Sequence, residues 1–202
     1  GALIATAADQ QAHEWSRIES GVFTHEVVSA LRGAADINGD LRVAYSELQA
    51  FVASANRDLK DPRARPDIRV HSPRSKPGSV LLDLATVKGV RWLHGDPGTL
   101  GRFRIEMDNG ECLLEAHLAP GRRTVLALPA GQEAYVLARG LEARVAQEHG
   151  PDLTFDHLEF AEGGWGKRGS VAQSLRADLF ASAYTVSYYN GYVEAMGVDG
   201  VA

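Results

Sequence analysis

Residues 101–118 read GRFRIEMDNGECLLEAHL, and this stretch predicts a β-hairpin. Apolar and charged residues alternate before Asn109-Gly110, a dipeptide that favours a two-residue hairpin turn. Such a turn sets three pairs opposite each other, namely Met107–Cys112, Ile105–Leu114 and Arg104–Glu115. The first two pairs are apolar and share one face, whereas the third joins opposite charges on the other face. The hydrophobic pattern and the turn therefore agree on one register.

Further short segments with strand character flank this hairpin at similar spacing. They are SVLLDLA (79–85), VRWLH (90–94), TVLALPA (124–130), EAYVLAR (133–139) and LTFDHLEF (153–160). Many short strands separated by turns are typical of antiparallel all-β architectures. We therefore predict that residues 78–202 form an antiparallel β-sandwich or barrel, with a helix near Val171–Ala183 and an aromatic tail, YTVSYYNGY, behind it.

Residues 57–77 separate this region from the N-terminal part of the chain. Their sequence, RDLKDPRARPDIRVHSPRSKP, contains four prolines, which break helices and central strands. It also carries seven basic residues against three acidic ones. We predict a solvated linker; contact of the basic run with a phosphate backbone or an acidic surface is the alternative.

Residues 1–56 have the character of an α/β unit. An apolar run, Ala2–Thr6, predicts a buried strand. A helix is expected from Gly21 to a stop at Gly33, and a second one after a capping box formed by Ser46 and Gln49. The predicted apolar faces of the two helices are Phe23, Val27, Ala30 and Leu31, and Leu48, Phe51, Val52 and Ala55.

Composition narrows the classes of protein to consider. The net charge of −5 argues against a general nucleic-acid binder, and no apolar run approaches the ~20 residues of a membrane span. The single cysteine, Cys112, excludes an internal disulfide and is typical of a reducing compartment. We therefore expect a cytoplasmic protein without nucleic-acid or membrane partners.

Two common hydrolase chemistries find no support in the residues. Cys112 shares the core face of the predicted hairpin with Met107, whereas His117 points to the opposite face, so the two cannot form a catalytic dyad within that strand. Cys112 is better explained as a small buried apolar residue. No Gly-x-Ser-x-Gly element occurs that would indicate a serine hydrolase.

The acidic segment 36–47, DINGDLRVAYSE, has the spacing of a calcium-binding helix–loop–helix. Asp36, Asn38, Asp40 and Glu47 occupy its positions 1, 3, 5 and 12. The sixth position normally holds glycine because the loop turns sharply there, but here it is Leu41. The hypothesis is a degenerate calcium site, and the alternative is a metal-free remnant of such a loop.

The N-terminal motifs together resemble the small-subunit half of caspase-like cysteine peptidases. The strand ALIAT, the Trp-containing loop AADQQAHEWSR and the helix start GVFTHEVVSAL follow one another with the order and spacing of that family. The continuation LRGAADINGDLRVAYSELQAFV resembles bacterial members, which often carry such an acidic loop and a β-rich extension. Bacterial relatives are often linked to cell death or antiviral defence.

This resemblance implies a cysteine endopeptidase whose catalytic Cys and His lie upstream of these residues. The chain then supplies substrate binding and one side of the central sheet, and its partners are the large catalytic part of the same protease and protein substrates. No cofactor is required by this chemistry. In the family, the missing dyad attacks the scissile carbonyl through a thiolate, and backbone N–H groups hold the oxyanion.

The resemblance also implies which residues bind the substrate. Animal caspases use an arginine directly after the loop Trp to bind acidic side chains, and here that position is Ser16. Asp9 and Glu14 instead favour Arg or Lys in the substrate, with Trp15 as an aromatic wall. The alternative is a solvated Glu14 and a core Trp15.

Two further interpretations stay open. One is a non-catalytic pseudo-protease, in which the scaffold survives and the β region binds a regulatory partner. The other is a calcium-sensing two-domain protein. Residues upstream of the chain would separate the first of these from an active protease.

Overall fold

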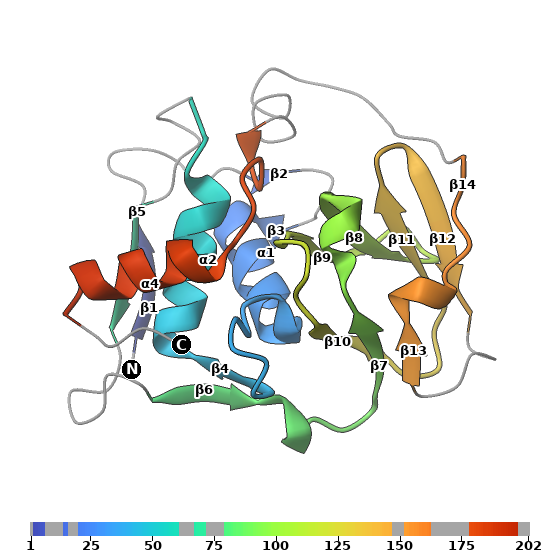
Figure 1. Ribbon diagram of the computed structural model, residues 1–202, viewed down its shortest axis with the longest axis horizontal. Coiled ribbons are helices and arrows are strands. Elements are labelled where there is room, and N and C mark those ends of the chain that lie inside the picture. Colours follow the sequence, from blue (N-terminus) through green and yellow to red (C-terminus); the bar gives the residue numbers. More distant parts are fainter. Residues whose placement is uncertain are drawn as a thin grey trace.

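A short strand pair and two helices form the N-terminal part of the chain in this computed structural model (Figure 1). The structure describes residues 2–6, 14–15, 20–60, 67–71, 79–146, 152–162 and 178–197. Strand β1 (Ala2–Thr6) confirms the predicted N-terminal strand. It pairs antiparallel with β5 (Asp67–His71), from Ala2 opposite His71 to Thr6 opposite Asp67.

Strand β5 lies inside the segment predicted as a linker, so that prediction is wrong for residues 67–71. The reason lies in the placement of the prolines. Pro66 directly precedes the strand and Pro73 follows it, so that no proline interrupts the hydrogen bonds to β1. The other residues of the predicted linker that the structure describes, 57–60, follow the second helix directly.

Helix α1 (Val22–Ser29) continues into one π-helical turn, η1 (Ala30–Ala34), which ends near Gly33 as the sequence predicts. Its most buried residues differ from the predicted apolar face. They include His25, Glu26 and Ser29, whereas Phe23, Val27 and Leu31 are only half-buried. The polar side of α1 faces strand β9 (Cys112–His117) and helix α2 (Tyr45–Asn56), where it finds hydrogen-bonding partners that the pattern along the chain does not reveal.

Helix α2 (Tyr45–Asn56) buries the four apolar residues predicted for it. The predicted capping box is wrong, because the helix begins earlier, with Ala44 at the N-cap position. Glu47 accepts a hydrogen bond from the Ala44 amide at 2.8 Å, and the Ser46 hydroxyl instead contacts the Tyr189 hydroxyl at 3.1 Å. Helix α2 packs against β5 and α4 (Figure 1).

The rest of the chain is rich in strands. Its elements are β6 (Val80–Asp83), β7 (Val90–Gly95), β8 (Arg102–Met107), β9 (Cys112–His117), β10 (Thr124–Pro129), β11 (Ala134–Ala138), β12 (Leu141–Val145), β13 (Asp152–Thr154), β14 (Ala161–Glu162) and α4 (Val186–Ala195), with 3₁₀ turns η2 (Leu84–Thr86), η3 (Pro97–Leu100) and η5 (Phe155–His157). One sheet has the order β14-β12-β11-β8-β9 and is antiparallel. A second has the order β10-β7-β13, with β13 parallel to β7.

This mixed α/β architecture, with more sheet than helix, agrees with the predicted fold class at that level. The strands do not close into a barrel within the described residues, and two open sheets are consistent with the predicted sandwich. Of the predicted segments, LTFDHLEF keeps only a short strand before η5, and β12 was not predicted. Residues 171–177 of the predicted C-terminal helix lie outside the described ones, and residues 179–183 are not helical. The aromatic tail predicted behind it forms most of helix α4.

The central hairpin confirms two of the three predicted pairs. Arg104 lies opposite Glu115 and Ile105 opposite Leu114, but Glu106 rather than Met107 lies opposite Cys112, and the register shifts at a bulge between Ile105 and Glu106. The turn is also one residue longer than predicted. The Met107 carbonyl accepts from the Gly110 amide at 2.9 Å, while the Met107 amide donates to the Glu111 carbonyl at 2.8 Å. Gly110 has φ +83°, which is the glycine position of a three-residue hairpin loop.

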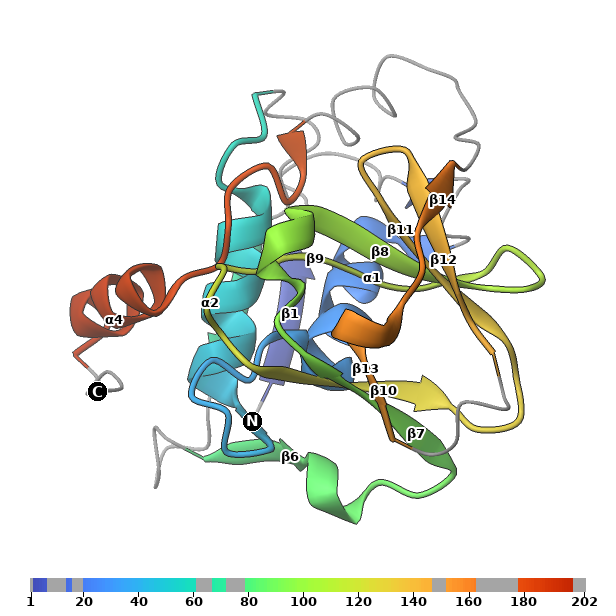
Figure 2. The same cartoon turned by 45° about the vertical axis from the view of Figure 1, so that its right-hand side comes forward.

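The helices and the β-rich region share one hydrophobic core. The centroid of the Phe51 ring in α2 lies 5.6 Å from the centroid of the Phe180 ring and 5.5 Å from that of the Tyr184 ring. Helix α1 packs against β9 (Figure 2), and η1 packs against β10. The predicted division into residues 1–56, 57–77 and 78–202 stays a prediction.

Candidate functional site

The residues predicted to bind substrate lie on the approach to α1. Strand β2 (Glu14–Trp15) pairs antiparallel with β3 (Ser20–Gly21), and α1 begins at the next residue. The backbone thus places Glu14 and Trp15 beside the first turn of α1. Asp9 and Ser16 lie outside the described residues. The specificity pocket formed by these four residues stays a prediction.

The acidic loop folds as a tight turn whose side-chain oxygens accept backbone N–H groups of the same loop. Asp36 accepts from Gly39, Asp40 and Leu41, Asn38 from Asp40, Asp40 from Arg42, and Glu47 from Ile37 and Ala44, at distances between 2.8 and 3.2 Å. After the turn, β4 (Arg42–Ala44) pairs antiparallel with β6. The four predicted ligands therefore lie in one loop, but each of them is engaged with the backbone.

No group of three or more His, Cys, Asp or Glu side chains is placed to hold a cation anywhere in the described ranges. A cation at this loop would compete with the backbone N–H groups for the oxygens of Asp36 and Glu47. Calcium binding at this loop stays a prediction that requires these side chains to rearrange.

Leu41 takes the left-handed conformation that glycine adopts at this point of a calcium-binding loop. Its φ is +61°, and its amide donates to Asp36 Oδ2 at 3.0 Å. A β-carbon makes this conformation unfavourable by about 1–2 kcal/mol. The sequence therefore preserves the loop geometry in spite of the residue at its sixth position, and Leu41 is strained.

We expect Leu41→Gly to be more stable than Leu41→Ala by about 1 kcal/mol, because both lose the side chain but only glycine relieves the strain. Leu141 is the matched control, since it is similarly exposed (39% against 36%) and lies in strand β12. There, Ala is expected to be the more stable variant. Urea unfolding of the four variants measures both differences, and the same order at both positions would contradict strain at Leu41.

Burial and repulsion between neighbouring carboxylates raise the pKa of acidic side chains in this loop. Glu47 is 2% exposed, and burial raises its pKa to about 7, with two backbone hydrogen bonds opposing and Asp36 and Asp40 adding to the shift. Burial also raises the pKa of Asp36. The loop therefore carries a carboxyl group that exchanges its proton close to neutral pH.

This titration predicts a pH-dependent stability. Folded Glu47 holds its proton more tightly than the unfolded chain, so its contribution to the free energy of unfolding is complete below about pH 4.5 and is lost as the pH rises through about 7. In Glu47→Gln this contribution no longer changes with pH. The stability of the unsubstituted protein relative to Glu47→Gln should therefore fall by roughly 3 kcal/mol between about pH 5 and about pH 9. Urea unfolding across this range measures the difference, and a constant difference would contradict the shifted titration.

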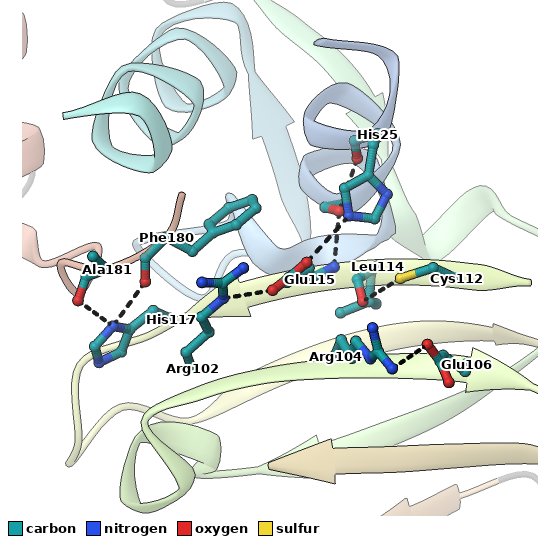
Figure 3. A network of polar contacts seen from close by, with 11 residues as sticks. His25, Arg102, Arg104, Glu106, Cys112, Leu114, Glu115, His117, Phe180 and Ala181 are labelled. Carbon is teal, nitrogen blue, oxygen red and sulfur yellow. Dashed lines mark hydrogen bonds and ion pairs between the residues drawn. The ribbon is translucent and has the colours of Figure 1, made fainter. Parts of the chain in front are cut away.

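A second polar cluster joins α1 to the central hairpin (Figure 3). Arg102 Nε donates to Glu115 Oε1 at 2.5 Å, and His25 Nε2 lies 3.9 Å from Glu115 Oε2. The Glu115 amide donates to the Ser29 hydroxyl at 3.0 Å, and that hydroxyl donates to the His25 carbonyl at 2.8 Å. Burial lowers the pKa of His25, although Glu115 opposes the shift. The cluster ties the buried polar side of α1 to β9.

This cluster was not predicted, because the hairpin pattern assigned Glu115 to Arg104 on the face opposite the apolar pairs. In the structure Arg104 pairs with Glu106, with 2.6 Å between Nη2 and Oε1, and Glu115 points to α1 instead (Figure 3). The sequence of α1 does contain an indication of this cluster, because His25 and Ser29 lie four residues apart and share one side of the helix. A polar stripe on a helix predicted to be buried indicates partners on the neighbouring element.

The single cysteine takes part in no catalytic arrangement with a histidine in the described part of the chain. Cys112 is half-buried, and its Sγ lies 3.7 Å from the Leu114 carbonyl oxygen. His117 Nδ1 lies 3.1 Å and 3.0 Å from the carbonyl oxygens of Phe180 and Ala181 (Figure 3).

Comparison with known proteins assigns no family to the chain. The chain matches no protein-family model, no curated protein and no solved structure. Among the residues described, no helix has the length and apolar character needed to cross a membrane.

Proposed function

We propose that the chain is the small-subunit part of a caspase-like cysteine endopeptidase that cleaves after Arg or Lys. The observation that carries the proposal is the order of elements between β1 and β5. The strand, the Trp-containing β2–β3 turn and α1 follow one another as the motifs of that family require, and α2 then leads to the strand that pairs with β1. The dyad belongs to a part of the protease upstream of this strand.

The surface around this unit suits a larger partner. Strands β1 and β5 form a two-stranded sheet within the described residues, and an isolated pair of this size is marginally stable. On α1, Phe23, Val27 and Leu31 stay half-buried, and Val28 is 37% exposed. Further strands beside β1 would complete the sheet and cover apolar surface of this kind.

Intact mass and N-terminal sequencing of the native protein test the origin of the dyad. We expect either a longer parent chain or a co-purifying polypeptide that contributes a Cys and a His. A chain that begins at Gly1 and purifies alone would contradict a cysteine-protease mechanism and favour the non-catalytic binding module.

Peptide cleavage by the complete enzyme tests the specificity. We expect cleavage after Arg or Lys, and a loss of about tenfold in kcat/KM for Arg peptides in Glu14→Gln, because one charge-assisted contact is removed. Asp108→Asn is the matched control, since Asp108 is an exposed acid on the hairpin turn. Unchanged Arg and Lys preference in Glu14→Gln would contradict the role of Glu14.

Calcium sensing by the acidic loop is the second candidate, and the left-handed Leu41 together with the β4–β6 pairing favours it. Calcium-dependent thermal stabilisation that disappears in the Asp36→Ala, Asp40→Ala variant would support this function. A melting temperature that calcium leaves unchanged would exclude it, without affecting the protease proposal.

A further inference from the structure

A cavity of about 980 Å³ opens between the acidic loop, β7, the turn before β10 and the first turn of α4. Its apolar lining includes Leu84, Trp92 and Val125. Its basic lining includes Arg122 and Arg123, both from the turn before β10. The volume lies within the range of sites that bind small organic molecules.

Arg122 has an unusual environment at this cavity. All three of its guanidinium nitrogens are buried and have no hydrogen-bond partner. Burial lowers the pKa of Arg122, and Tyr184, Asp36 and Glu47 oppose this shift. No ion pair within 4 Å joins Arg122 to any acid in the part of the chain that is described. A buried guanidinium normally binds an anion or several carbonyl groups, so that Arg122 has donors left for a ligand.

The turn that carries Arg122 is held firmly. Asp96 accepts hydrogen bonds from Gly98 at 2.9 Å and from Gly121 at 2.6 Å, which joins η3 to this turn. Gly98 also packs so closely that a β-carbon there would lie 2.3 Å from Pro120 Cα. The arginine is therefore presented by a rigid backbone, which lowers the entropic cost of binding a ligand.

Helix α4 adds positive potential on the opposite wall. Its first two residues, Val186 and Ser187, line the cavity, and their amides have no acceptor within the helix. The Thr185 hydroxyl accepts from the Tyr188 amide at 3.0 Å, so that the N-cap is formed and the helix is ten residues long. The N-terminus of such a helix attracts negative charge.

The negative groups at this cavity are already engaged. Asp36 is 4% exposed, and both of its oxygens accept backbone N–H groups of the acidic loop. Glu47 accepts from the amides of Ile37 and Ala44. Neither carboxylate takes up a donor of the Arg122 guanidinium, so that these donors are left for an external anion.

We propose that this cavity binds a small organic anion, with the carboxylate or phosphate group on Arg122 and an apolar body against Trp92, Leu84 and Val125. The observations that carry the proposal are the unpartnered guanidinium and the apolar lining beside it. This binding site is independent of the proposed protease activity.

Isothermal titration calorimetry of the whole chain with phenyl phosphate and with benzoate tests the proposal, using inorganic phosphate and benzyl alcohol as the anion-only and body-only probes. We expect saturable binding of phenyl phosphate or benzoate that is at least about tenfold tighter than that of benzyl alcohol and of inorganic phosphate, because both parts of the site contribute. The tighter of the two anions identifies the charged group. Benzyl alcohol or inorganic phosphate binding as tightly as the combined probe, or no saturable binding of either anion, would overturn the proposal.

Variants locate the site. Arg122→Gln should weaken the binding of the tighter anion by about tenfold or more. Arg144→Gln removes an equal charge from the surface of β12 and should leave the affinity for this anion unchanged. Ala85→Trp fills the cavity from an exposed lining position and should also abolish binding, even where Arg122→Gln fails to fold. Undiminished binding in folded Arg122→Gln or in Ala85→Trp would refute this location.

Discussion

Gly33→Ala should lower the free energy of unfolding by about 4 kcal/mol or more. Gly33 has φ +107°, and a β-carbon built there lies 2.1 Å from the Val125 carbonyl oxygen. That oxygen belongs to the backbone of β10, so that the clash is relieved only by moving η1 away from the sheet. The substitution therefore disrupts the packing of η1 against β10.

Gly140→Ala is the matched control, because Gly140 also has a positive φ, of +81°, but no atom lies within 4 Å of its added β-carbon. Gly140→Ala should lower the free energy of unfolding by about 1 kcal/mol, because only the backbone conformation becomes less favourable. Urea unfolding of both variants separates the close approach from the left-handed conformation. Equal losses in the two variants would show that η1 and β10 can separate without a large cost.

Glu115→Ala should destabilise the protein by about 3 kcal/mol. Glu115 is 2% exposed and accepts from Arg102 at 2.5 Å, so that removing it leaves a partly buried guanidinium without this carboxylate. His25 loses the same neighbour, at 3.9 Å. Breaking one side of a buried ion pair costs more than the pair itself contributes, since the remaining charge stays desolvated.

Glu133→Gln is the matched control, because it weakens the exposed ion pair with Arg144 and should leave the stability unchanged. The double variant Arg102→Leu, Glu115→Leu should recover much of the loss, since it removes both charges together. Chemical unfolding of the three proteins measures these differences. A Glu115→Ala protein as stable as the unsubstituted one would show that water reaches Arg102 freely.

Local patterns in the sequence predicted those elements whose side chains and turns agree. The alternating residues and Asn109-Gly110 identified the central hairpin and two of its pairs, and the four residues predicted as the apolar face of α2 all lie in the core. The spacing of Asp36, Asn38, Asp40 and Glu47 likewise predicted a tight loop between two helices. In these cases the interactions that matter join residues close in the chain.

Predictions failed where distant segments supplied the partners. The longer turn places Cys112 opposite Glu106, and a bulge between Ile105 and Glu106 then restores the predicted pairing; the dipeptide alone specified neither. Proline content suggested a linker, but pairing with β1 forms a strand at Asp67–His71. Ser46 has the right spacing for a cap, yet Tyr189, far along the chain, contacts its hydroxyl instead.

The sequence by itself therefore determined the strand-rich class of the chain, its main hairpin, its two N-terminal helices and the acidic loop, because local propensity and periodicity encode these features. Only the tertiary structure decided that the polar side of α1 is buried against Glu115, that Gly33 packs η1 against β10, and that Arg122 lies unpartnered beside a cavity. Each of these depends on burial and on contacts between residues far apart in sequence. A periodic pattern carries no information about such contacts, since it shows which residues are polar but not which residues they contact in the fold.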